Sequence, residues 1–311
     1  MNGSTSTPPI RFDGRVAIVT GAGGGLGRAH ALLLGARGAK VVVNDIGGAV
    51  DGSGAGQVSA AERVVEEIRA AGGEAIPHHG SVADPEAAHA LVNAAVNTWG
   101  RLDVLINNAG ILRDKTLVRM EPEDFERVVA VHLLGSAWCS RAALPVMQGQ
   151  GYGRIVMTTS AAGLYGNFGQ TNYGAAKMGL VGLMKALVLE GRKYGITVNT
   201  VAPVALTRMT EGLPLAAMLE QATPERVAAA VGFLCSEACT LNGEIVAAGA
   251  GYFARVQVVE SAGVHLPPDD ITPEAVAANW GRIADMTGAR AFGSAGDALM
   301  GAFATKGGVR G

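Results

Sequence analysis

Three side chains in the middle of the chain have the types and the spacing for hydride-transfer chemistry. Tyr173 and Lys177 stand four residues apart in a helical pattern, so both project from one face of the helix. Ser160 comes 13 residues before Tyr173 and directly follows an apolar run. An alcohol that loses a hydride also needs a base for its hydroxyl proton. A tyrosine serves as that base at neutral pH if its pKa falls by about 3 units, roughly 4 kcal/mol. The Lys177 ammonium one turn away supplies an electrostatic cause, and Ser160 can hold the substrate oxygen.

A glycine-rich turn, TGAGGGLG at residues 20–27, separates an apolar run from a helical pattern. Backbone N–H groups at a helix N-terminus attract a pyrophosphate, and glycine lets the backbone approach it closely. The pattern TGxxxGxG fits with Gly21, Gly25 and Gly27, whereas GxGxxG does not fit. Glycines alone would also suit a flexible turn, but a strand before and a helix after favour a dinucleotide site.

Asp45 ends the second apolar run, 18 residues beyond Gly27. A carboxylate at this place accepts hydrogen bonds from an adenosine ribose and repels a 2′-phosphate. No Arg or Lys follows it directly or stands inside the glycine turn. The residue therefore predicts NAD rather than NADP, and oxidation rather than reduction, although a solvated aspartate at a strand end is the plainer alternative.

A regular fold must hold these side chains in place. Along the chain, short apolar runs alternate with helical patterns, which predicts alternating strands and helices. Strands are expected at residues 16–20, 40–44, 74–79, 104–107, 155–159, 197–202 and 244–248. Apolar runs without alternation indicate parallel strands that are covered on both faces. We therefore expect an α/β fold, a single Rossmann-type doubly wound sheet of seven parallel strands. Residues 1–250 would form the NAD-binding catalytic domain, and residues 251–311 a C-terminal helical extension that packs on the core or on a partner subunit.

Composition excludes several other classes of protein. The 311 residues include 25 Lys plus Arg and 27 Asp plus Glu, a balance that argues against nucleic acid or a membrane surface as partner. Hydrophobic residues make up 49% and charged residues 17%, which predicts a sizeable core. Cys139, Cys235 and Cys239 are too few for a disulfide framework and lack partners at zinc spacing, so we expect buried thiols and no metal. Without an apolar stretch of 18 residues, a signal peptide or a peroxisomal C-terminus, a cytoplasmic protein is expected.

The chain resembles the short-chain dehydrogenase/reductase family, whose TGxxxGxG, NNAG, Ser and YxxxK motifs appear here in order. The runs YGRIVMTTSAAGLYGNFGQTNYGAAKMGLVGL and ITPEAVAANWGRI are similar to one branch of it, the dehydrogenase domains of peroxisomal multifunctional enzymes type 2 (17β-hydroxysteroid dehydrogenases type 4). The resemblance implies NAD-dependent oxidation of a (3R)-3-hydroxyacyl-CoA to the 3-oxoacyl-CoA in fatty-acid or steroid side-chain β-oxidation. It also implies a homo-oligomer, either a dimer or a tetramer.

The resemblance further assigns roles to residues. Ser160 would orient the substrate, Tyr173 would accept the proton, and Lys177 would lower the tyrosine pKa and hold the nicotinamide ribose. The remaining cofactor contacts would come from Gly21, Gly25, Leu26 and Gly27 at the pyrophosphate, Asp45 and Asn108 at riboses, Ser81 and Val82 at the adenine, and Thr207 at the carboxamide.

Two departures from the family pattern and several alternatives remain at this stage. His132 stands where the wider family has a catalytic Asn, so it either serves a proton relay or is structural, and Pro203 is followed by Val204 instead of Gly. The apolar segment at residues 207–219 is expected to close over the substrate, with Leu164, Tyr165 and Phe168 as pocket walls. A 17β-hydroxysteroid dehydrogenase acting on a free steroid alcohol is the nearest rival function. A 3-oxoacyl carrier-protein reductase is disfavoured by Asp45, and a non-catalytic NAD-binding scaffold is the rival from another class.

Overall fold

The computed structural model describes residues 8–48, 51, 59–204 and 222–304, in two compact units, Met1–Arg255 and Val256–Gly311. Thr207, the whole segment 207–219 and most of the connection after Asp45 lie outside the described residues. Each unit is described by itself.

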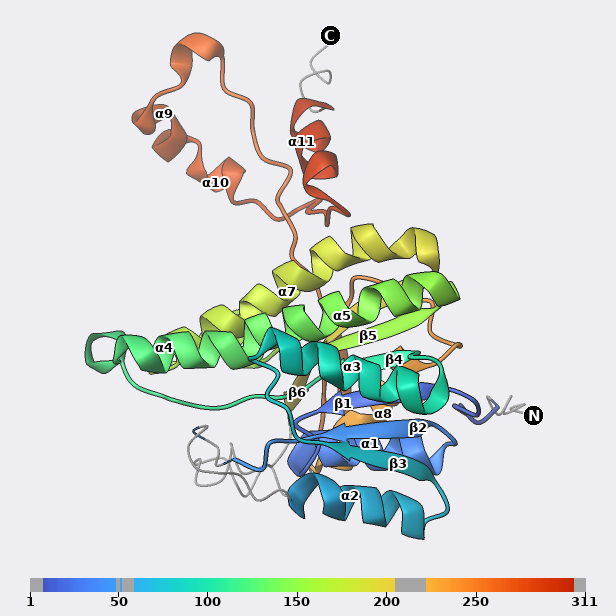
Figure 1. Ribbon diagram of the computed structural model, residues 1–311. Helices are drawn as coiled ribbons and strands as arrows, with labels where there is room; N and C mark the ends of the chain where they lie inside the picture. Colours follow the sequence, from blue (N-terminus) through green and yellow to red (C-terminus); the bar gives the residue numbers. More distant parts are fainter. Residues whose placement is uncertain (1–7, 49–50, 52–58, 205–221, 305–311) are drawn as a thin grey trace, which may run out of the picture. The chain divides into compact units, whose positions relative to one another are not determined.

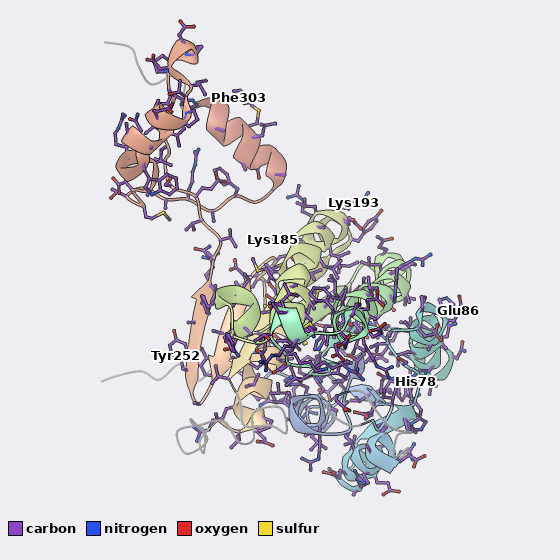
Figure 2. All side chains as sticks on the ribbon, turned by 90° about the vertical axis from the view of Figure 1, so that its left-hand side faces the viewer. His78, Glu86, Lys185, Lys193, Tyr252 and Phe303 are labelled. Atoms are coloured by element: carbon purple, nitrogen blue, oxygen red, sulfur yellow. The ribbon has the colours of Figure 1, made fainter. Side chains whose placement is uncertain are left out.

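The first unit is built on a sheet with the strand order β3-β2-β1-β4-β5-β6-β7-β8 (Figure 1). The strands are β1 Val16–Thr20, β2 Lys40–Asn44, β3 Glu74–His78, β4 Val104–Asn107, β5 Gly153–Thr158, β6 Ile196–Val204, β7 Ile245–Gly249 and β8 Tyr252–Val256. His78 in β3 and Tyr252 in β8 mark the two edges of this sheet (Figure 2). The strand order reverses direction between β1 and β4, the place where α/β sheets bind ligands.

The first seven strands pair in parallel, which confirms the predicted doubly wound sheet. The eighth strand is an addition that the sequence reasoning missed. Only Ala250 and Gly251 separate it from β7, and such a connection is a hairpin because a parallel crossover needs a dozen residues. Both residues have positive φ angles, 50° and 81°, the backbone of a type I′ turn.

Helices cover both faces of the sheet. They are α1 Gly25–Ala36, α2 Ser59–Ala70, α3 Pro85–Trp99, α4 Pro122–Val129, α5 Gly135–Gln150, α6 Ala161–Tyr165, α7 Thr171–Gly191 and α8 Pro224–Cys235. Helices α1, α2 and α8 pack on one face, while α3, α5 and α7 pack on the other (Figure 1). A π-helical turn, Ala130–Leu134, connects α4 to α5. Short 3₁₀ turns lie at Leu117–Arg119 and Arg192–Tyr194.

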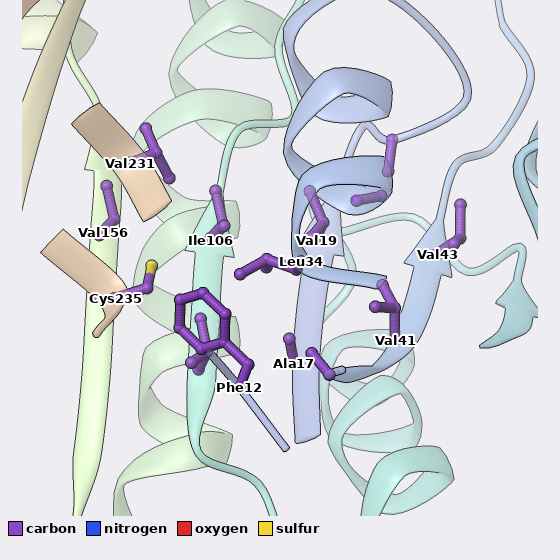
Figure 3. Close-up of a cluster of buried hydrophobic side chains, with 14 of the residues drawn as sticks. Phe12, Ala17, Val19, Leu34, Val41, Val43, Ile106, Val156, Val231 and Cys235 are labelled. Atoms are coloured by element: carbon purple, nitrogen blue, oxygen red, sulfur yellow. The ribbon is translucent and has the colours of Figure 1, made fainter. Parts of the chain in front are cut away.

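The core on the α1 side shows why the strand sequences are apolar throughout. Alternate residues of the central strands, among them Val19 in β1 and Ile106 in β4, meet Leu34 of α1 and Val231 of α8 (Figure 3). Burial of each such side chain stabilises the fold by about 1.5–3 kcal/mol. Cys139, Cys235 and Cys239 are free and buried, as predicted.

The second unit consists of short helices. They are a 3₁₀ turn at Pro268–Asp270, α9 Pro273–Ala278, α10 Trp280–Ile283 and α11 Ala295–Ala304. Thr272 caps α9 by accepting a hydrogen bond from the Ala275 amide at 3.1 Å. An antiparallel β-bridge between Glu260 and Arg290 joins the two ends of the segment that contains α9 and α10. Among the described residues of the whole chain, no helix is long and apolar enough to cross a membrane.

Candidate active site

A cavity of about 480 Å³ lies at the carboxyl ends of the central strands, at the point where the strand order reverses. Most of the residues that the sequence reasoning selected line it: Gly21, Gly25, Leu26, Asp45, Ser81, Val82, Asn108, Tyr173 and Lys177. Gly27 and Ser160 are not among the lining residues, and Thr207 lies outside the described part of the chain.

The glycine turn brings the N-terminus of α1 to this cavity. Gly24, Gly25 and Leu26 line it, no side chain caps the helix, and its first turn carries no acidic residue. The positive end of the helix dipole is therefore available to an anion. Gly27 has a different task, because a Cβ there would lie 2.2 Å from the Gly21 carbonyl oxygen. It allows α1 to pack directly on the turn, which the motif alone does not show.

Asp45 holds the glycine turn as well as facing the cavity. Its Oδ2 accepts a hydrogen bond from the Gly23 amide at 2.8 Å, and its Oδ1 accepts one from the Gly47 amide at 2.6 Å. Each carboxylate oxygen has a second lone pair, so the side chain can still accept a hydrogen bond from a hydroxyl group. Asp45 therefore holds the glycine turn in its conformation and can also accept a hydrogen bond from a ligand in the cavity.

The NNAG loop after β4 is tied to the same turn. The Asn108 side chain donates to the carbonyl oxygens of Thr20 at 2.9 Å and Gly21 at 3.1 Å. The Thr20 hydroxyl in turn accepts from the amides of Asn108 and Ala109 at 2.9 and 3.0 Å. Sequence reasoning did not select Thr20, although it is the first letter of the TGxxxGxG motif.

Tyr173 and Lys177 meet in the cavity as their spacing on α7 predicts. Lys177 is buried, and its Nζ donates to the Thr158 carbonyl oxygen at 2.5 Å and lies 5.5 Å from the centre of the Tyr173 ring. Ser160 is the N-cap of α6, where its hydroxyl accepts from the Ala162 amide at 3.2 Å. The Ser160 hydroxyl also lies close enough to the Tyr173 phenol to lower the tyrosine pKa.

The charges of this site follow from burial. Burial lowers the pKa of Lys177 to about 7. Burial raises the pKa of Tyr173, the neighbouring Ser160 hydroxyl lowers it and the charge of Asp114 raises it, with a net shift upward. This direction is opposite to the one expected from the YxxxK spacing, because loss of hydration disfavours the charged form of both groups.

His132 lies beside Tyr173, within the π-helical turn. It is buried, its ring meets the Tyr173 ring edge-on at 5.2 Å, and its Nε2 lies 3.0 Å from the Ile111 amide nitrogen and 2.8 Å from the Ile111 carbonyl oxygen. Within the described chain its Nδ1 has no hydrogen-bond partner. Burial, followed by the charge of Lys177, holds the His132 pKa well below its ordinary value, so the imidazole is neutral. Turns of this kind inside helices occur frequently at functional sites.

The expected pocket walls are placed differently. Tyr165 and Phe168 are 73% and 89% exposed, and neither they nor Leu164 line the cavity. The prediction that they wall it is wrong for the cavity as described, and the segment 207–219, which the sequence predicts to close over the substrate, lies outside the described residues. Pro203 at the end of β6 does line it, together with Ile111 and Val131.

Comparisons with known proteins agree with this geometry. The family model described as short chain dehydrogenase matches residues 15–215. The chain is 46% identical over 298 residues to peroxisomal multifunctional enzyme type 2 of Drosophila melanogaster, covering 95% of this chain and 49% of that protein. It therefore spans about half the length of that relative. It is also 48% identical to a putative short-chain type dehydrogenase/reductase of Mycobacterium tuberculosis, covering 90% of this chain and 97% of that one.

Solved structures give the same result. The full-length Drosophila melanogaster enzyme superposes with a TM-score of 0.80 at 40% identity, over 95% of this chain and 50% of that one. A 7α-hydroxysteroid dehydrogenase complexed with NADH and 7-oxo glycochenodeoxycholic acid superposes with a TM-score of 0.69 at 30% identity, over 78% of this chain and 95% of that one. Sequence, fold and site together place the chain in the short-chain dehydrogenase family.

Proposed function

We propose that this protein oxidises a (3R)-3-hydroxyacyl-CoA to the 3-oxoacyl-CoA with NAD as hydride acceptor. One observation carries the proposal: Tyr173 and Lys177 line the same cavity as the glycine turn and Asp45. The acyl-CoA class is supported by the likeness to peroxisomal multifunctional enzyme type 2 and to a protein named peroxisomal hydratase-dehydrogenase-epimerase.

The residues present fit a nicotinamide dinucleotide. A Cβ at Gly21 would lie 2.7 Å from the Ala109 Cα, so glycine is needed where the turn meets the NNAG loop. Gly21, Gly25 and Leu26 would hold the pyrophosphate and Asp45 the adenosine ribose, with Ser81 and Val82 beside the adenine. Asn108 would contact the ribose that adjoins the adenine, Tyr173 and Lys177 would face the nicotinamide half, and Thr207 would meet the carboxamide. When bound, the cofactor accepts the hydride and adds a positive charge beside the tyrosine.

The chain's own residues would handle the proton. The Ser160 hydroxyl, which lies close enough to the Tyr173 phenol to affect its pKa, would hold the substrate oxygen beside that phenol. Tyr173 would take the hydroxyl proton, and a protonated Lys177 would stabilise the phenolate. Because burial brings the pKa of Lys177 to about 7, the lysine can exchange a proton near neutral pH. Asp45 would favour NAD because its carboxylate repels a 2′-phosphate.

The test is NADH formation at pH 8 to 9 by the purified protein, offered NAD or NADP with the (3R)- or (3S)-3-hydroxyacyl-CoA. The proposal predicts turnover of the (3R) isomer with NAD and at least tenfold less with NADP. Turnover of only the (3S) isomer, or a preference for NADP, would overturn it.

A free steroid alcohol is the second candidate, because the 7α-hydroxysteroid dehydrogenase complex superposes on this chain with a TM-score of 0.69. Estradiol in the same assay decides between the two substrates. Tyr173→Phe addresses the rival from another class, since a non-catalytic NAD-binding scaffold would bind NAD with or without this hydroxyl and turn nothing over.

We also propose that the protein forms a homo-oligomer. Helix α7 exposes Met178 and Leu189, which are 41% and 44% accessible, and the π-helical turn exposes Leu134 at 40%. Light scattering on the purified protein should give two or four times the chain mass of 31.6 kDa. A mass equal to one chain at micromolar concentration would contradict self-association. A cytoplasmic location stays a prediction, since relatives in the comparison are named peroxisomal.

A further inference from the structure

Tyr173 lies in the first turn of helix α7, which begins at Thr171. The N–H groups of a first turn have no acceptors within the helix, and helix ends fray. A catalytic side chain at such a place keeps its position only if something outside the helix holds that turn.

Asn172, the residue before the tyrosine, belongs to this first turn, and its side chain makes three hydrogen bonds, two of them to groups outside the helix. Its Oδ1 accepts from the Tyr173 amide at 2.7 Å. Its Nδ2 donates to the carbonyl oxygens of Arg113 at 3.0 Å and Asp124 at 3.3 Å. The side chain is fully buried, so these bonds do not compete with bulk water. One amide thus joins the start of α7 to the loop after β4 and to α4.

Ion pairs hold the two residues whose carbonyl oxygens accept these bonds, Arg113 and Asp124. Asp124, which is buried in α4, accepts from Arg113 Nη1 at 2.8 Å and from Lys115 Nζ at 2.7 Å. Gln170, just before α7, donates to the Asp114 carboxylate at 2.6 Å, and a β-bridge pairs it with Lys115. The loop at residues 113–115 is therefore held on both sides, and Asn172 bonds to a rigid frame.

We propose that Asn172 is a positioning residue for the catalytic tyrosine, an inference that rests on the proposed function of Tyr173. It anchors the backbone of Tyr173, so that the phenol stays in register with Ser160 and with Lys177 further along the helix. Because catalysis depends on near-contact geometry, loss of this anchor acts on turnover more than on binding.

The experiment compares Asn172→Ala with Asn199→Ala. Asn199 is a matched control because it is also fully buried and bonds only to backbone, donating to the Leu241 carbonyl oxygen at 2.9 Å and accepting from the Glu244 amide at 3.0 Å. It lies in β6 and does not line the cavity. Both variants lose buried hydrogen bonds, so thermal unfolding should show comparable losses of stability.

Only Asn172→Ala should lose turnover. At a temperature where both variants are folded, we expect its kcat to fall about 10- to 100-fold, with KM for the acyl-CoA and Kd for NAD within about twofold of wild type. Its kcat–pH profile should also shift, because the surroundings of the phenol change. Asn199→Ala should keep the wild-type kcat and profile.

Asn172→Ser serves as the conservative variant, because its hydroxyl keeps an acceptor beside the Tyr173 amide. It should recover part of the lost kcat, and it also answers the question if the alanine variant does not fold. Equal kcat values for Asn172→Ser, Asn172→Ala and wild type would overturn the proposal, as would equal losses of kcat in Asn172→Ala and Asn199→Ala. Tyr173→Phe is measured alongside: if it remains active, the proposed function itself fails, whereas an inactive Tyr173→Phe with a fully active Asn172→Ala refutes only the positioning role.

Discussion

A substitution at Gly110 tests the contact between the rings of His132 and Tyr173, because the glycine leaves room for the His132 ring. A Cβ at residue 110 would lie 2.3 Å from His132 Cε1, and ordinary contacts begin near 3.4 Å. The ring would have to move by about 1 Å, because two unbonded carbons keep their van der Waals separation. It cannot do so freely, since its Nε2 is bonded to the Ile111 backbone and its edge meets Tyr173.

Gly110→Ala should therefore lower both stability and turnover. Overpacking costs about 1–3 kcal/mol, and loss of the hydrogen bond to Ile111 adds about 1 kcal/mol. Displacement of the Tyr173 ring by a comparable distance should reduce kcat about 100-fold. The backbone of Gly110 is not in the left-handed region, so the effect would be steric and not conformational.

Denaturant unfolding and NADH formation measure the two effects. Gly149→Ala is the control, because this α5 glycine has open space around its Cβ position and should gain up to about 1 kcal/mol in helix propensity. The double variant Gly110→Ala/His132→Asn should regain stability, since the smaller side chain relieves the clash. Wild-type kcat and stability in Gly110→Ala alone would refute the reasoning.

Three further predictions concern acid stability, the last hairpin and cofactor choice. His30 is fully buried, its ring nitrogens have no hydrogen-bond partner among the described residues, and burial lowers its pKa to about 3. The unfolded chain therefore binds a proton at this histidine more readily than the folded chain does. The free energy of unfolding should be full above pH 6.5 and should fall by up to about 1.4 kcal/mol per pH unit as the pH drops toward 3. His30→Leu should flatten this decline in thermal melts between pH 6.5 and 4, and an unchanged slope would contradict it. Ala250→Asn should stabilise the protein by about 0.5–1 kcal/mol, because asparagine tolerates the positive φ of the first turn position, and a lower melting temperature would show that the turn is different. Asp45→Ser should lower kcat/KM with NAD at least tenfold relative to NADP, and an unchanged ratio would show that Asp45 acts only on the glycine turn.

The sequence predicted the scaffold well where a local pattern has a direct structural cause. Asp84 followed by Pro85 predicts the start of α3, and the structure shows the Asp84 carboxylate accepting from the Glu86 amide at 3.0 Å. The apolar, non-alternating strands predicted a parallel sheet because both faces are covered. The eighth strand was not predicted from the sequence. Its turn places Ala250 at a positive φ that alanine rarely adopts, and its side chains Tyr252 and Phe253 are largely exposed, so neither the turn nor the strand has the usual sequence pattern.

In the site, spacing predicted which residues meet but not their energetics. Tyr173 and Lys177 line the same cavity, yet burial raises the pKa of Tyr173 and lowers that of Lys177, and the YxxxK spacing predicts neither shift. The side chains of Thr20 and Asn172 form hydrogen bonds to backbone groups that are distant in sequence, so a local sequence pattern could not predict these bonds. His132 lies in the π-helical turn, and its ring occupies the space that Gly110 leaves free, which is likewise a contact between residues distant in sequence.

The most direct test of the account is NADH formation from a (3R)-3-hydroxyacyl-CoA by the wild-type protein and by Tyr173→Phe, with NAD binding measured on both. The account predicts steady turnover by the wild type, at least 1,000-fold less by the variant because the general base is lost, and the same Kd for NAD in both. Comparable turnover by both proteins, or none by the wild type with either cofactor, would contradict it.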